Sequence, residues 1–169
     1  LTANGLKDGG NWFGIAEWAR EAVDPSDFRE PPPPPGAPRL AFVLDGPYGK
    51  QYFHTDYRSL SDDGSTWVAE YSSPEPARLI LQGADRLPPG ITGWIEITGQ
   101  GRFPLSPGFA IDLERRAGAL SIHVGDADYL DGTVGRLPPA KTALMPCYPN
   151  PANPEIRTVN HQMTNKSQT

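Results

Sequence analysis

Short stretches of alternating hydrophobic and polar residues run through the middle of the chain, from residue 39 to about residue 124. In the stretch ALSIHV (119–124), Leu120 and Ile122 fall on one side and Ser121 on the other. This period of two is the pattern of a β-strand with one buried face. Clusters of turn-forming residues separate seven such stretches, at residues 40–44, 50–55, 66–71, 78–82, 93–98, 109–113 and 119–124.

The pattern predicts an all-β fold, an antiparallel immunoglobulin-like or fibronectin-type-III-like sandwich of about seven strands. No amphipathic segment of helical length interrupts the strands, so a parallel sheet with crossover helices is not expected. We expect the β-sandwich domain at residues 39–134. An irregular leader precedes it at 1–38, and a proline-rich linker and polar tail follow it at 135–169.

The leader and the tail carry weaker patterns. Residues 1–6 fit a short strand, and residues 15–22 predict one or two helical turns. The proline run at 31–35 predicts a stiff polyproline II spacer, although such runs also serve as ligands for aromatic grooves. Residues 156–169 are polar and are expected to form a solvated tail, with an edge strand as the alternative.

Composition supports a loop-rich β protein and excludes some partners. The 169 residues include 20 prolines and 18 glycines, an excess that disfavours a helical bundle. The net charge is −5 and there is no lysine or arginine run, so nucleic acid is not an expected partner. No segment approaches the roughly 20 apolar residues of a membrane span, so membrane insertion is not expected. A single cysteine, Cys147, excludes an internal disulfide framework.

The residue types that carry catalysis are scattered. His54, His123 and His161 have no neighbouring ligand at metal-binding spacing. His54 and Asp56 would share a face of one strand, but no nucleophile accompanies them. Cys147 lies in a proline-rich segment without a base beside it, which favours a free or intermolecularly paired thiol. We therefore expect no catalytic residue, no metal and no cofactor.

An acidic run, GDADYLDG, is superficially similar to a calcium-binding loop. Asp126 and Asp128 fit the first and third positions of an EF-hand loop. Leu130 and Leu137 fail its fifth and twelfth positions, and Asp131 stands where the loop needs glycine. A calcium site of another kind is the alternative that this run leaves open.

Aromatic residues raise carbohydrate binding as a function, because aromatic rings stack on the apolar faces of sugars. Trp94 is the candidate residue, since Ile95 and Ile97 are expected to be the inward-facing residues of the same strand. Trp12 and Trp18 lie in the leader and are expected to cover one end of the sandwich. A core role for these aromatic residues is the alternative.

One segment near the end of the chain resembles a known linker. Residues 147–155 (CYPNPANPE) are similar to the YPNPFNP segment of many secreted bacterial proteins. In those proteins the segment introduces a C-terminal sorting domain, which is either type IX-like or an immunoglobulin-like domain similar to those of hook-capping proteins. Ala152 stands where that segment usually has phenylalanine, and the residues after Pro154 are too few for such a domain. The matching positions are Tyr148, Pro149, Asn150, Pro151, Asn153 and Pro154.

The upstream stretches FHTDYRS, TWVAEY and LSIHVGDADYL resemble the β-sandwich module that often precedes this linker. The resemblance implies an accessory module without an assigned active site, located outside the cell or at its surface. We thus expect a non-enzymatic structural or adhesive module of a secreted or surface-associated bacterial assembly. Its partners would be neighbouring domains or subunits, including copies of itself. The alternatives are a carbohydrate-binding module whose partner is a polysaccharide, and a fibre subunit that assembles by strand complementation.

Overall fold

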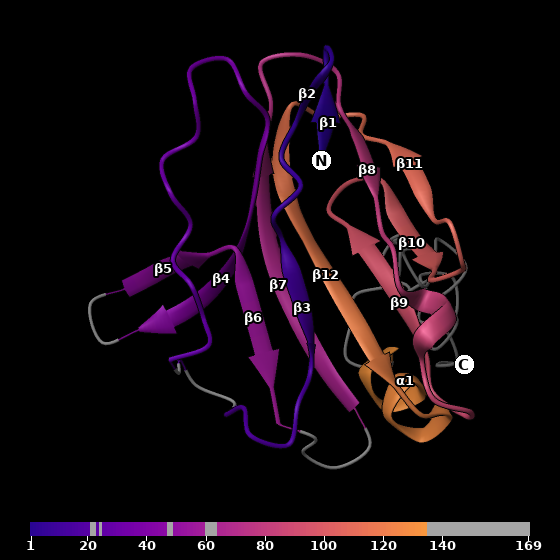
Figure 1. Ribbon diagram of the computed structural model, residues 1–169. Coiled ribbons are helices and arrows are strands. Elements are labelled where there is room, and N and C mark those ends of the chain that lie inside the picture. The colour runs from indigo at the N-terminus through magenta and orange to yellow at the C-terminus, as the bar shows by residue number, and fades with distance from the viewer. Residues whose placement is uncertain (21–22, 24, 47–48, 60–63, 135–169) are drawn as a thin grey trace, which may run out of the picture. The chain divides into compact units, whose positions relative to one another are not determined.

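Twelve strands and one short α-helix make up the described part of the chain (Figure 1). The computed structural model describes residues 1–20, 23, 25–46, 49–59 and 64–134. A six-stranded sheet has the order β10-β9-β12-β7-β4-β5. Its strands span Gly101–Pro104, Thr92–Ile97, Ala117–Gly125, Gly64–Ser72, Arg39–Gly46 and Gly49–Phe53, in that order.

Two smaller sheets complete the strand inventory. A four-stranded sheet has the order β11-β8-β1-β2, with strands at Ala110–Asp112, Arg78–Ile80, Thr2–Ala3 and Leu6–Lys7. A two-stranded sheet pairs β3 (Trp12–Ile15) with β6 (Thr55–Arg58). The helix α1 spans Ala127–Val134, and a 3₁₀ turn, η1, spans Ala84–Arg86.

The all-β prediction is confirmed, and each of the seven predicted stretches contains a strand. The count of about seven is wrong for the described residues, which form twelve strands. The predicted strand at 50–55 divides at His54 into β5 and β6, which belong to different sheets. All pairings are antiparallel except that of β3 with β6, which is parallel.

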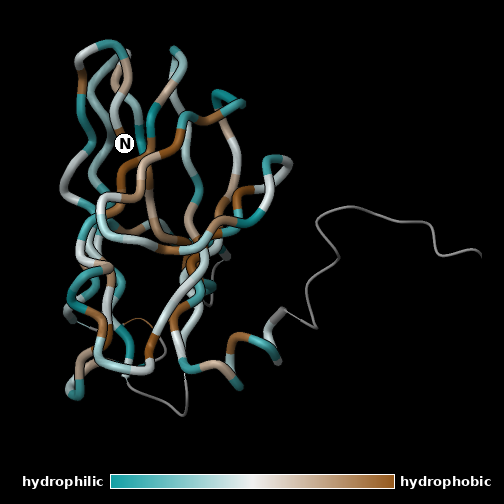
Figure 2. Tube along the Cα trace, turned by 90° about the vertical axis from the view of Figure 1, so that its right-hand side faces the viewer, coloured by the Kyte–Doolittle hydropathy of each residue, from teal (hydrophilic) through white to brown (hydrophobic). Residues whose placement is uncertain are grey.

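The two smaller sheets pack on one face of the six-stranded sheet. The predicted faces are confirmed there, since Trp67, Ala69 and Tyr71 of β7 are at most 4% exposed. The buried cluster joins them to Leu79 of β8, and Phe13 of β3 packs against it. Figure 2 shows hydrophobic segments along the strands and hydrophilic ones at many of the turns. The remaining buried members are Leu1, Ala3, Leu40, Phe42, Ala77, Ile95, Ile97, Leu113, Leu120, Ile122 and Val124.

The leader differs from the irregular segment that we predicted, because it supplies three strands. β1 pairs with β8, and β3 pairs with β6, so both leader strands join strands that come much later in the chain. The helical turns predicted from residue 15 onward are wrong for the described residues, where β3 ends at Ile15 and a turn follows. Residues 31–35 are exposed and lie outside helices and strands.

A buried ion pair fixes β6 against the six-stranded sheet. Arg58 donates to both carboxylate oxygens of Asp56, at 3.1 and 3.0 Å. The same guanidinium donates to the backbone oxygen of Thr66 and lies 5.6 Å from the ring centre of Trp67. The Trp67 Nε1 in turn donates to the backbone oxygen of Asp56, at 3.0 Å. These contacts set the position of the β3–β6 sheet.

Candidate functional site

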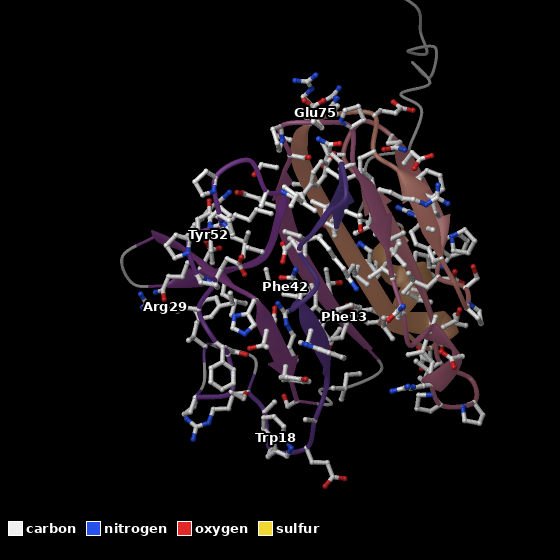
Figure 3. The ribbon with its side chains drawn as sticks, turned by 45° about the horizontal axis from the view of Figure 1, so that its top comes forward. Phe13, Trp18, Arg29, Phe42, Tyr52 and Glu75 are labelled. Carbon is white, nitrogen blue, oxygen red and sulfur yellow. The ribbon has the colours of Figure 1, made fainter. Side chains whose placement is uncertain are left out.

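A cavity of about 190 Å³ opens where the two smaller sheets stand apart over the six-stranded sheet. Its floor consists of side chains from β4, β9 and β12. Phe13 of β3 forms one wall, and Leu79 of β8 belongs to the wall across from it. Phe13 also contacts Phe42, with ring centres 5.7 Å apart, and Figure 3 shows both rings in the interior between the sheets. The floor residues are Leu40, Phe42, Ile95, Leu120 and Ile122.

Polar side chains also contribute to the lining of this cavity. They are Lys7, Asp8, Asn11 and Gln82, of which Lys7 and Gln82 are exposed, as is Trp12, and mark the mouth. Asp8 is already engaged, because its Oδ2 accepts the backbone N–H of Leu40 at 2.6 Å. The Oδ1 of Asn11 is buried and has no hydrogen-bond partner. The cavity therefore combines an apolar floor with a polar mouth, the usual composition of a small-molecule site.

Three aromatic side chains come from β3, from the turn that follows it and from β6, and we call them the aromatic surface: Trp12, Trp18 and Tyr57. Of the three, Trp12 also lines the cavity. Trp12 is 62% exposed and Trp18 is 65% exposed. The Trp18 and Tyr57 rings lie 5.7 Å apart at an angle of 50°. Tyr57 pairs in register with Gly14, which has no side chain to cover the tyrosine ring. Figure 3 shows Trp18 at the end of the molecule, away from the Phe13–Phe42 interior.

Local sequence explains why these rings point outward. In β3 the period of two sends Phe13 into the core and turns Trp12 and Gly14 to the other face. In β6 the same period sends Asp56 and Arg58 inward and leaves Tyr57 outside. The expectation that Trp12 and Trp18 cover an end of the sandwich does not agree with their exposure, which is among the largest of the hydrophobic residues described.

A neighbouring segment supports the aromatic surface from the other edge of β6. Thr55 is 6% exposed, and its Oγ1 accepts the N–H of Phe28 at 2.6 Å and donates to the backbone oxygen of Ser26 at 2.9 Å. Asp27 accepts the N–H of Tyr57 at 3.2 Å. The Phe28 ring stacks on His54, with centres 5.8 Å apart. The tyrosine backbone is thereby held on both sides.

Trp94, the position singled out from the sequence, lies on the opposite face of the six-stranded sheet. Ile95 and Ile97 of β9 are at most 1% exposed, as expected, and Trp94 is half-buried on the outer side. It pairs in register with His123 of β12 and Pro104 of β10. The structure thus does not bring Trp94 together with the aromatic surface.

His123 also faces outward as predicted, but it is only 5% exposed. Its Nδ1 lies 2.8 Å from the Thr66 hydroxyl, which lies 2.8 Å from the Tyr129 hydroxyl of α1. Its Nε2 is buried without a hydrogen-bond partner. Burial lowers the pKa of His123, the charge of Glu96 partly offsets this, and Arg102 lowers it further. The ring is therefore neutral at neutral pH.

The remaining sequence candidates are separate from one another. His54 Nδ1 lies 3.1 Å from the Arg29 backbone oxygen, whereas Asp56 pairs with Arg58, so the two do not form a pair. The acidic run forms the start of α1 rather than a loop, and Asp126 Oδ1 accepts the N–H of Tyr129 at 2.8 Å. Cys147, His161 and the linker-like positions from Tyr148 to Pro154 lie outside the described residues.

Sequence reasoning missed the aromatic surface, although a usable signal was present. In the run Trp12–Phe13–Gly14, residues 12 and 14 fall on the same face of a strand. Because glycine has no side chain, the tryptophan on that face would be left uncovered.

Among the described residues, no three His, Cys, Asp or Glu side chains gather closely enough to hold a metal ion. The described part also contains no helix with the length and hydrophobicity that crossing a membrane requires.

The candidate site thus consists of the cavity, its polar mouth and the aromatic surface beside it. These parts suit non-covalent recognition, because exposed rings bind by stacking and the mouth offers amide and charged groups for hydrogen bonds. No protein-family model, no curated protein and no solved structure matches this chain.

Proposed function

We propose that this chain is a non-enzymatic, adhesive module that binds carbohydrate through the aromatic surface. The observation that carries the proposal is the exposure of two tryptophans, 62% for Trp12 and 65% for Trp18. The Trp18 ring lies 5.7 Å from Tyr57, which pairs with Gly14, two residues after Trp12. Large apolar side chains exposed together mark binding surfaces in soluble proteins. Flat rings with polar groups at their margin match sugars, which have apolar faces and hydroxyl edges.

The polar margin favours a sugar over an apolar partner. Gln82 and Lys7 are exposed residues of the cavity lining, as is Trp12, and they offer an amide oxygen, amide N–H groups and an ammonium group. A purely apolar partner would leave these groups without hydrogen bonds, which is unfavourable. Because Tyr57 pairs with Gly14, two residues beyond Trp12, and Trp18 contacts Tyr57, the ligand would be an oligosaccharide chain rather than a single sugar.

The test is binding to a panel of cellulose-, xylan-, mannan- and chitin-derived oligosaccharides, followed by calorimetry on the best ligand. We expect Trp12→Ala and Trp18→Ala each to weaken binding roughly two- to tenfold, the effect of losing an aromatic contact of about 0.5–1.5 kcal/mol. The matched control is Trp94→Ala, which removes a tryptophan from the opposite face and is expected to leave the affinity unchanged.

Three outcomes would contradict this assignment. Absence of binding to the whole panel would remove carbohydrate recognition as the function. Loss of binding in Trp94→Ala alone would move the binding face to the outer side of β9, the position indicated by the sequence pattern. Release of reducing sugar from any ligand would contradict the non-enzymatic part of the proposal.

The cellular setting is proposed on the linker-like segment. Tyr148, Pro149 and Asn150 belong to a motif similar to the one that precedes sorting domains, which favours a secreted or surface-associated bacterial assembly and an extracellular location. Within it, neighbouring domains or subunits would be the partners. We also propose that the two packed layers are a variant of an immunoglobulin-like or fibronectin-type-III-like sandwich. Fractionation of producing cells would test the location.

The fibre-subunit alternative stays a prediction. Strand complementation needs a strand that leaves its own subunit or an edge that accepts one. β1 already pairs on both sides, with β2 and with β8, and so occupies its own sheet. Light scattering of the intact chain at high concentration would detect assembly.

A further inference from the structure

The cavity beside Trp12 has a shape and chemistry that select one sugar substituent. Its volume of about 190 Å³ is below the roughly 300–1,000 Å³ of sites for drug-sized ligands, so it accepts a single small group. The floor is formed by Leu40, Phe42, Ile95, Leu120 and Ile122, which favour an apolar group. A sugar hydroxyl on this floor would lose its hydrogen bonds to water without replacement.

The wall of the cavity adds a second requirement. The Asn11 side-chain oxygen is a hydrogen-bond acceptor, buried at this wall and without a partner in the protein. A buried polar atom without a partner is unfavourable, so a ligand that supplies an N–H is favoured there.

An acetamido group meets both requirements at once. Its methyl group would lie on the apolar floor, and its N–H would donate to the Asn11 oxygen. The sugar ring that carries it would remain at the mouth, where Trp12 offers a largely exposed aromatic face. Neither a hydroxyl nor a protonated amine at the same ring position satisfies both, and the charge of the amine would also be repelled by that of Lys7, which lines the same cavity.

We propose that the cavity is a subsite for the acetamido group of an N-acetylated sugar, so that the chain binds glycans rich in N-acetylhexosamine. This rests on the proposed carbohydrate-binding function and specifies its ligand class. Trp12 contacts the ring of the N-acetylated sugar, and the Trp18–Tyr57 pair contacts sugars further along the chain.

The test uses three oligosaccharide series that differ only at the second carbon of each sugar: N-acetylglucosamine, glucosamine and glucose oligomers of equal length. We expect the acetamido series to bind at least about tenfold more tightly than the other two, the combined effect of one buried methyl group and one hydrogen bond. Equal affinity for the acetamido and hydroxyl series would overturn the subsite and leave the proposed carbohydrate binding intact. Absence of binding to all three would overturn the subsite, and the proposed carbohydrate binding would be overturned as well if the rest of the oligosaccharide panel also failed to bind.

Two variants locate the effect in the cavity. Asn11→Leu removes the acceptor at similar volume, and Leu81→Phe fills the cavity from its wall. Both are expected to reduce the acetamido preference to within about twofold while the hydroxyl series binds as before. Asn11→Asp keeps an acceptor and is expected to retain the preference. Thermal unfolding of each variant shows that it is folded, and a preference that survives in both Asn11→Leu and Leu81→Phe would exclude this cavity.

Discussion

The Asp56 side chain is 2% exposed and its partner Arg58 is 14% exposed, so both charges of this ion pair are largely removed from water. Neither charge is stable at this position without the other, because each ion has lost its hydration. Two parallel hydrogen bonds connect it, and Arg58 also contacts Thr66 and Trp67 of β7. The pair therefore joins β6, and with it Tyr57, to the larger sheet.

Removing one of the two charges tests how far the stability of the fold depends on this ion pair. We expect Asp56→Asn to lower the free energy of unfolding by about 3 kcal/mol, because it leaves the Arg58 guanidinium buried without a counterion. The matched control is Asp112→Asn, which breaks an exposed pair with Arg78 and should change it by less than about 1 kcal/mol. Urea unfolding followed by tryptophan fluorescence measures both. Equal losses in the two variants would contradict a structural role specific to the buried pair.

Single residues also show the limit of sequence reasoning about the site. Alternation correctly placed Trp94 opposite Ile95, because its strand is long enough to show the period. The aromatic surface was missed because β3 has only four residues, and because Ile15 and the following Trp18 also fit a helical spacing. Outward-facing aromatic residues form a site only when segments far apart in the sequence pair, as the strands of Gly14 and Tyr57 do. No local sequence pattern encodes such a pairing.

At the scale of elements, helix α1 depends on an acidic residue that the sequence associated with a calcium loop. Asp126 precedes the first helical residue, and its Oδ1 accepts the N–H of Tyr129 at 2.8 Å. This is the N-cap arrangement, in which a side-chain oxygen satisfies a backbone donor of the first turn. The cap also orients Tyr129, whose hydroxyl reaches Thr66 of β7.

We expect Asp126→Ala to lower the free energy of unfolding by about 1 kcal/mol, the usual effect of losing an N-cap side chain. Asp131→Ala is the control, since it removes an exposed carboxylate from the same helix and should stay within about 0.5 kcal/mol of the parent chain. Chemical unfolding of the two variants compares them directly. A larger loss in Asp131→Ala would show that the acidic run acts through another contact.

Length explains part of what the sequence predicted. β4, β7, β9 and β12 have six to nine residues, enough for alternation to identify the strand and its buried face. β2 and β10, which the pattern missed, have two and four residues, too few for a period to appear. Helix α1 contains aspartates and a glycine, which favour turns in isolation, so its helical form depends on the cap and on buried Leu130.

The two smaller sheets lie on one face of the six-stranded sheet, so the residues on its other face have different surroundings. His123 is buried on that outer face, between strands β7 and β9 and beneath the Tyr129 contact. The charged groups that influence it come from neighbouring strands, Glu96 of β9 and Arg102 of β10. A buried neutral imidazole there makes the stability of the whole domain depend on pH.

The direction of this dependence follows from the lowered pKa of His123. Well above pH 6.5, its ordinary pKa, the ring is neutral in both the folded and unfolded chains and adds no pH dependence. As the pH falls through 6.5, the unfolded chain binds a proton before the folded chain does, so the folded state loses stability. The loss from one proton is limited to about 1.4 kcal/mol per pH unit.

We therefore expect the free energy of unfolding to fall between about pH 7 and pH 5.5, and His123→Asn to reduce this fall. Asparagine does not titrate in this pH range, but it can keep a polar atom near the Thr66 hydroxyl. The substitution therefore separates the effect of protonation from the effect of losing the hydrogen bond. His54→Asn changes a histidine between β5 and β6 and tests whether removing any histidine has the same result. Urea unfolding at each pH measures all three chains. An unchanged pH profile in His123→Asn would mean that the imidazole does not control the acid sensitivity of the fold.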